Sequence, residues 1–177
     1  MRISAILVPL LILCISQFVH ANEDLLAPAK EGKLWCYEPD SENKTCSSFS
    51  RFEWDGAGNI WEEDELAISA NPLVTMKVRD STTIEGNSIC QVAKEDTFQK
   101  AVFLVDGNPA PADQDRTYRE TYGTYFAPFY GKKLCLDISP YENVFITQVT
   151  IDGTPYPSAT SRLKWISADE DYVLAPF

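Results

Sequence analysis

The chain has 177 residues, of which 45% are hydrophobic and 23% charged, a composition typical of one globular domain with its own core. It carries 26 acidic and 15 basic residues, a formal net charge of −11. This charge argues against binding to nucleic acid or to an anionic membrane surface, because both need clustered lysine and arginine. It leaves a basic protein or a cation as a partner.

The first 21 residues have the pattern of a secretory signal peptide. Arg2 precedes an apolar run from Ala5 to Ile15, and Val19-His20-Ala21 resembles a small-residue cleavage site. An uncleaved anchor is the alternative, but the apolar stretch is at the short limit for crossing a bilayer. We therefore expect a single exported domain over 22–177, periplasmic or secreted, with no membrane association after cleavage.

His20 is the one histidine of the sequence, so a chain cleaved after Ala21 contains none. Without imidazole, Ser-His-Asp and Cys-His catalysis and histidine-ligated metal sites are excluded. The sequence also has no glycine-rich phosphate loop and no G-x-S-x-G elbow. We expect no catalytic residues, no metal and no cofactor, and we favour a non-enzymatic protein over an enzyme.

Four cysteines remain after cleavage: Cys36, Cys46, Cys90 and Cys135. An even number in an exported chain predicts two disulfides. Four cysteines allow three pairings, and the sequence alone does not choose among them. We favour Cys36–Cys46, which would close a polar loop, and Cys90–Cys135, which would join two strands. Zinc is the alternative, which the lack of a CxxC pair disfavours.

From Lys33 onward the hydrophobic pattern is mostly that of β-strands. Phe52 and Trp54 fall on one face at period two, and Leu73 to Arg79 alternates apolar and polar residues most regularly. The segment 60–69 is ambiguous, because a run of four acidic residues interrupts its apolar pattern.

Three glycine dipeptides predict tight turns between strands: Gly86-Asn87, Asp106-Gly107 and Asp152-Gly153. The last two lie in similar surroundings, because a cysteine, an apolar strand and an Asp-Gly-x-Pro-x-Pro turn recur in the same order. This suggests an internal repeat of roughly 88–112 and 133–158. Coincidence is the alternative, because Asp-Gly-x-Pro is common turn chemistry.

One segment, Asp113 to Phe126, predicts a helix. Its aromatic residues recur at helical spacing, Asp113 and Asp115 favour its start, and Pro128 ends it. With the strands, this helix predicts a mainly β (α+β) fold. We expect an antiparallel sheet, or a partly open barrel or sandwich, with one packed helix and two disulfides.

Two features could bind a ligand. The aromatic stripe of the helix could form a platform for a sugar, although packing on the sheet explains it more simply; its candidate binding residues are Tyr118, Tyr122, Tyr125 and Tyr130. The acidic run could bind a cation, or supply the carboxylate pair of a glycoside hydrolase, with Glu62 and Glu63 as candidates. Charge runs more often mark a solvated face.

These features lead to two function hypotheses. The first is an exported, disulfide-bonded binding or protein-interaction module without enzymatic activity. Its partner would be another protein, a basic one if charge steers the association. The alternative is a carbohydrate-binding or carbohydrate-active protein that uses paired carboxylates and an aromatic platform.

Overall fold

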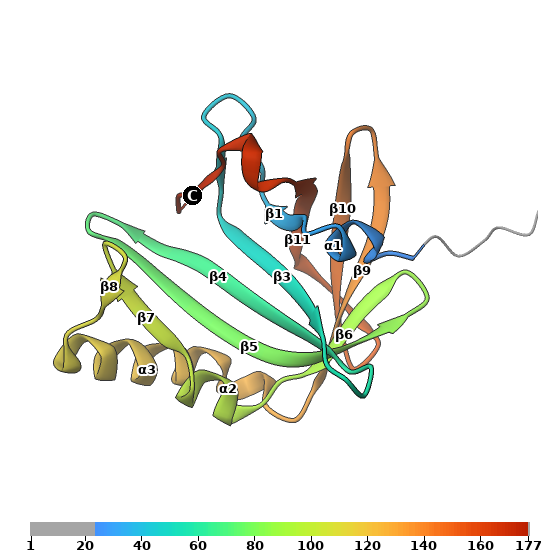
Figure 1. The fold of residues 1–177 in the computed structure, drawn as a ribbon. Coiled ribbons are helices and arrows are strands. Elements are labelled where there is room, and N and C mark those ends of the chain that lie inside the picture. Colours follow the sequence, from blue (N-terminus) through green and yellow to red (C-terminus); the bar gives the residue numbers. More distant parts are fainter. Residues whose placement is uncertain (1–23, 177) are drawn as a thin grey trace, which may run out of the picture.

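The structure, a computed structural model, describes residues 24–176, so the predicted signal peptide (1–21) lies outside the described residues. Within this range eight antiparallel strands form an up-and-down barrel (Figure 1). They are β1 (Leu34–Tyr37), β3 (Ser48–Trp54), β4 (Ile60–Ala70), β5 (Leu73–Glu85), β6 (Ser88–Val92), β9 (Lys133–Tyr141), β10 (Val144–Ile151) and β11 (Thr154–Ile166). The ring is closed, because β1 pairs with both β3 and β11 and β4 pairs with β5. The predicted mainly β fold is confirmed, and the barrel is closed instead of partly open.

The ambiguous segment of the sequence is β4. Its acidic residues alternate between the two faces of the strand, so that Glu62 and Asp64 point into the barrel while Glu63 and Glu65 point outward. The outer carboxylates meet basic side chains on neighbouring strands, Glu63 with Arg51 at 3.6 Å and Glu65 with Lys77 at 3.2 Å. Cross-strand pairs of opposite charge make this acidic run compatible with a strand.

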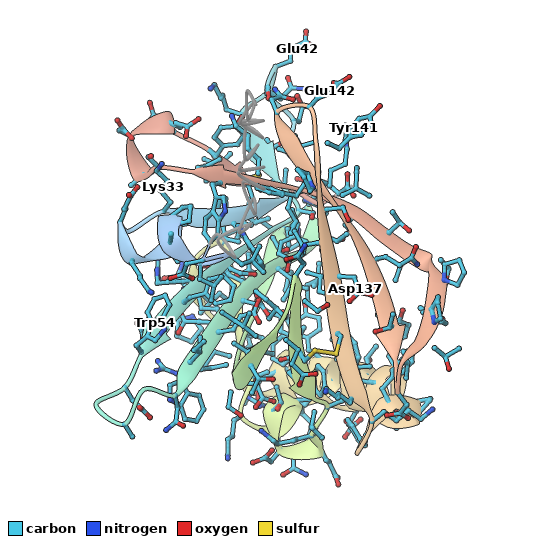
Figure 2. All side chains as sticks on the ribbon, turned by 90° about the vertical axis from the view of Figure 1, so that its right-hand side faces the viewer. Lys33, Glu42, Trp54, Asp137, Tyr141 and Glu142 are labelled. Carbon is cyan, nitrogen blue, oxygen red and sulfur yellow. A yellow bond between two sulfur atoms is a disulfide. The ribbon has the colours of Figure 1, made fainter. Side chains whose placement is uncertain are left out.

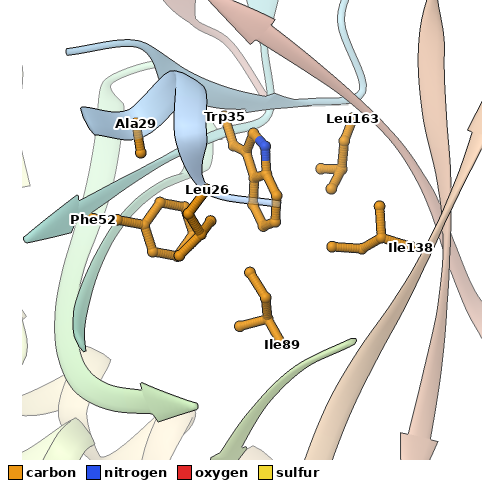
Figure 3. Packing of buried hydrophobic residues seen from close by; sticks show 7 residues of the cluster. All are labelled: Leu26, Ala29, Trp35, Phe52, Ile89, Ile138 and Leu163. Carbon is orange, nitrogen blue, oxygen red and sulfur yellow. The ribbon is translucent and has the colours of Figure 1, made fainter. Parts of the chain in front are cut away.

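One end of the barrel is filled by an apolar core around Trp35, which is fully buried (Figure 3). The Trp35 ring lies 5.0 Å from that of Phe52, edge to face, and 4.9 Å from that of Trp165. The single-turn helix α1 (Ala27–Lys30), which the sequence did not predict, covers this end, and Leu26 and Ala29 pack into the same core. This end of the barrel is therefore closed.

The other end is covered by helices. β4 and β5 extend past the barrel, and β7 (Val102–Val105) and β8 (Asn108–Pro109) continue the sheet beside β5. The predicted helix is confirmed as α3 (Ala112–Phe126), which lies along this extension together with the short helix α2 (Glu95–Gln99) and the turn η1 (Ala127–Phe129) (Figure 1). Tyr118 and Tyr122 of α3 pack on Phe103 of β7, with ring centroids 5.3 and 6.0 Å apart.

Both favoured disulfides are confirmed in the described part of the chain. Cys36–Cys46 joins β1 to the short strand β2 (Thr45–Cys46). β2 pairs with β12 (Val173–Leu174), which follows the turn η2 (Ala168–Glu170) in the chain. Cys90–Cys135 links directly opposed residues of β6 and β9. Figure 2 shows β9 running from Tyr141 at its free tip past Asp137 toward the helical end, so this bond ties the wall of the barrel near the helices.

The predicted turns are also confirmed. Gly86-Asn87 joins β5 to β6, and both Asp-Gly pairs have positive φ at both residues: 48° and 77° at Asp106-Gly107, 50° and 77° at Asp152-Gly153. The second pair joins β10 to β11 in the barrel, whereas the first joins β7 to β8 outside it. The internal repeat stays a prediction.

Candidate functional site

The candidate site is a polar layer in the middle of the barrel. Along β4 the inward positions change from Ile60 to Glu62, Asp64 and then Leu66, and the facing positions of β3 change from Trp54 and Phe52 to Ser50 and Ser48. The two carboxyl groups are neighbours on one face, on Cα atoms about 6–7 Å apart at the usual rise of a strand. The interior thus becomes polar just beyond the apolar core at the α1 end.

Neither carboxyl group has a basic partner. The Ser50 hydroxyl donates a hydrogen bond to Asp64, and one hydroxyl proton cannot satisfy Glu62 as well. Glu62 is only 6% exposed, and among residues 24–176 no side chain forms an ion pair with Glu62 or Asp64. Glu62 therefore lies in the interior without compensation for its charge.

Another inward-facing carboxyl group, that of Asp80, shows the contrast. Asp80 of β5 lies opposite Glu62 and binds Lys94 Nζ at 2.5 Å, the Thr97 hydroxyl at 2.6 Å and the Ser81 backbone N–H at 2.7 Å. These contacts anchor α2 to the barrel and leave Lys94 engaged with Asp80. The charge of Asp80 is compensated, and that of its neighbour is not.

Burial and mutual repulsion change the acidity of this layer. Desolvation, with the charge of Asp64 second, raises the pKa of Glu62 well above its ordinary value. Desolvation raises the pKa of Asp64 to about 6, against the hydrogen bond from Ser50, which lowers it. The pKa of the Tyr37 hydroxyl on β1 is also raised well above its usual range by burial and by the two carboxylates. The layer therefore favours holding a proton or another positive charge.

Three cavities adjoin Asp64. One, of about 140 Å³, lies toward the helices and has mostly apolar walls, which include Leu66, Met76, Val78, Phe98 and Phe126. The second, of about 160 Å³, lies within the barrel and is lined by polar and apolar groups, among them Tyr37, Glu62, Ile89, Gln91 and Val149. Asp64 thus stands where an apolar compartment meets a polar one.

The third cavity, of about 300 Å³, is wider and more open to solvent. It lies where β1 and its pairing with β3 end at Tyr37, and its polar walls include Ser48 and Ser161. The Asp64 carboxyl borders this cavity too. A small molecule could therefore reach Asp64 from this solvent-open cavity.

The predicted site residues are spread over the molecule. Glu62 belongs to the polar layer, whereas Glu63 points outward to Arg51. Tyr130 donates its hydroxyl hydrogen to the Gly123 carbonyl at 3.0 Å, and Tyr125 is 67% exposed. Tyr118 and Tyr122 contribute to the packing of α3, as described above. The structure does not bring these tyrosines together with Glu62, and their role in binding stays a prediction.

Other residues of the polar layer were not recognised in the sequence: Tyr37, Ser50, Asp64 and Gln91. Asp64 could have been found, because it follows Glu62 at the two-residue period of a strand. The others come from three different strands, and no local pattern connects them.

Comparisons of the chain with protein-family models, with curated proteins and with solved structures find no match. In the described range no group of three or more His, Cys, Asp or Glu is arranged to hold a metal ion. Over the same residues no helix is long and apolar enough to cross a membrane. Fold and site together define a closed eight-stranded barrel with an internal acidic layer between two covered ends.

Proposed function

We propose that this protein is a binding module that holds a small molecule inside its barrel. One observation carries the proposal: two inward-facing carboxyl groups, Glu62 and Asp64, border cavities in the barrel and have no basic partner in the described chain. Buried charges in proteins are normally paired or hydrogen-bonded. A ligand with a hydrogen-bond donor would satisfy them.

The architecture supports a small ligand. Eight-stranded barrels are just wide enough either to be filled by side chains or to hold one small ligand. An apolar cavity of about 150 Å³ accepts a molecule the size of benzene. The three cavities at Asp64 measure about 140, 160 and 300 Å³. Apolar walls with a few convergent polar groups are typical of ligand sites.

The module is proposed to act outside the cytoplasm. Two disulfides tie its strands together, and such bonds persist in oxidising compartments. The signal-peptide pattern of the first 21 residues supports export in the same way. A periplasmic or secreted binding module is consistent with both.

The proposal is tested with 1-hexanol, a neutral probe that fits the cavities, titrated into the disulfide-bonded protein and followed by amide NMR shifts. We expect saturable binding in the millimolar range, since each buried methylene contributes about 0.8 kcal/mol, with shifts at Glu62, Gln91 and Val149. Val149→Trp, which fills the second cavity, should abolish binding. The control Val173→Trp changes a valine that is 58% exposed and should leave it intact.

Shifts confined to the outer surface, or unchanged binding in a folded Val149→Trp protein, would contradict an internal site. If Val149→Trp does not fold, Ser161→Phe blocks the third cavity instead. Binding of glucose at the same lining residues would support the carbohydrate alternative.

Recognition of a basic protein remains the second candidate. It is supported by the net charge of −11 and by exposed aromatic side chains near η1, where Tyr125 is 67% and Tyr156 43% exposed. Charge-steered association weakens with added salt. A partner captured equally at low and high salt would argue against steering.

A further inference from the structure

The charge balance around the polar layer is negative. Glu62, Asp64 and Asp80 lie on the inner face of β4 and β5. Among the described residues, Asp80 alone of the three has a basic partner, Lys94 at 2.5 Å. Glu62 and Asp64 are left with one serine hydroxyl between them. The site of Glu62 and Asp64 is therefore short of positive charge as well as of hydrogen-bond donors.

The placement of Glu62 points independently to a missing partner. Glu62 is 6% exposed and lines the second cavity. Among the described residues it forms no ion pair, and it shares the Ser50 hydroxyl with Asp64. A carboxylate buried this deeply costs several kcal/mol unless a cation or donors compensate it. Because the uncompensated oxygen atoms border a cavity, an occupant of that cavity can supply the compensation.

The adjoining apolar compartment indicates what else this occupant carries. Leu66 and Met76 form its barrel side, and Phe98 of α2 stacks on Phe126 of α3 with ring centroids 4.3 Å apart on its helical side. Aromatic rings present faces that suit both hydrocarbon and cationic groups. A bare metal ion or ammonium ion would leave this compartment unused.

We infer that the ligand is an amphipathic organic cation, an alkyl- or arylammonium compound, whose charged head lies between Glu62 and Asp64 and whose apolar part lies against Leu66, Met76, Phe98 and Phe126. This inference rests on the proposed function and specifies its ligand. The ammonium N–H groups donate to the two carboxylates, and the hydrocarbon part extends along the apolar walls. A neutral alcohol of the same shape could donate one hydrogen bond but would leave the negative charge of the pair without a cation.

The test compares hexylammonium chloride with 1-hexanol, two probes of equal chain length, by titration calorimetry at pH 8 on the disulfide-bonded protein. The wild type should bind hexylammonium at least tenfold more tightly than 1-hexanol. Asp64→Asn and Glu62→Gln should each reduce this advantage to threefold or less. The control Glu63→Gln removes one charge from the outer face of the same strand and should retain the full advantage.

The outcomes separate this inference from the proposed function. Equal affinity of the wild type for both probes would overturn the cationic ligand and leave an internal binding site standing. Binding of neither probe would overturn both. An advantage that survives in Asp64→Asn and Glu62→Gln but disappears in Glu63→Gln would place the cation on the outer surface, and would also overturn the inference.

Discussion

Asp64→Asn should stabilise the protein, and by an amount that depends on pH. In the folded protein the pKa of Asp64 is raised to about 6 from an ordinary value of 3.8, mainly by desolvation. The folded state then binds more protons than the unfolded chain between about pH 4 and pH 6. The free energy of unfolding therefore falls as the pH rises through this window. Above about pH 6 Asp64 is ionised in the folded protein, and the whole destabilisation caused by its burial is present.

The structure sets the size of the effect. The difference between about 6 and 3.8 corresponds to about 3 kcal/mol at 25 °C. Asparagine has nearly the same shape, carries no charge, and its amide oxygen can accept the hydrogen bond from Ser50. The variant should thus be more stable than the wild type by up to about 3 kcal/mol at pH 8 and by less than about 1 kcal/mol at pH 4.

The measurement is urea unfolding at pH 4 and pH 8 under non-reducing conditions, followed by tryptophan fluorescence, to which the buried Trp35 contributes. Other titratable groups around Asp64 are Tyr37, Glu62, Glu63, and Asp80 with its partner Lys94. The charge of Glu63 also raises the pKa of Asp64, and all these groups are common to both proteins. Removing the charge of Asp64 also relieves its repulsion of the Glu62 carboxylate. This second effect stabilises the Asp64→Asn variant further at high pH.

Glu63→Gln is the matched control for this experiment. Glu63 neighbours Asp64 on β4 but faces solvent, with an ion pair to Arg51 at 3.6 Å. Exposed pairs contribute little, so this variant should change stability by about 0.5 kcal/mol or less at both pH values. An equal effect of Asp64→Asn at pH 4 and pH 8, or a loss of stability that grows with pH, would refute the burial of an uncompensated carboxylate at this position.

Three further predictions concern the frame around the site. Replacing both cysteines of Cys36–Cys46 by serine should lower the free energy of unfolding by about 3 kcal/mol, and the same change at Cys90–Cys135 by about 4 kcal/mol. The second loss is larger because that bond closes a longer loop (sequence separations of 10 and 45). Denaturant unfolding measures both, and a larger loss at Cys36–Cys46 would contradict this ranking. Tyr118→Ala should lower the free energy of unfolding by about 2–4 kcal/mol, because the Tyr118 ring packs on Phe103. Tyr125→Ala should lower it by about 0.5 kcal/mol or less, because Tyr125 is 67% exposed. Similar shifts of the melting temperature for the two variants would argue against this packing of α3. Lys94→Met should destabilise by about 1–3 kcal/mol at pH 7, since it leaves the buried Asp80 without its cation. Unchanged stability in denaturant unfolding would contradict a compensating role of Lys94.

Local chemistry accounts for much that the sequence predicted correctly. Asp106-Gly107 and Asp152-Gly153 form tight turns because aspartate and glycine tolerate positive φ wherever they occur. The helix α3 follows from the spacing of its own aromatic residues. The disulfide pairing was favoured correctly because a short polar loop and two apolar strands are each visible locally, although three pairings were open.

The candidate site depended on information that no single segment contains. Sequence reasoning chose the adjacent residues Glu62 and Glu63, but the strand period places them on opposite faces, and only the register of β4 against β3 shows which one points inward. Gln91 and Tyr37 join Glu62 because the barrel closes, bringing together residues far apart in the chain.

The sequence by itself determined the β-rich class, the turns, the long helix and the acidic balance, because these follow from residue types and their spacing over a few positions. Tertiary structure alone decided that the sheet closes, that α1 and α3 cover its two ends, and that Glu62 and Asp64 lie in a cavity without a cation. The physical reason is that burial and electrostatic compensation are properties of the whole surroundings of a side chain. A carboxylate becomes a candidate binding group only when every strand around it is in place.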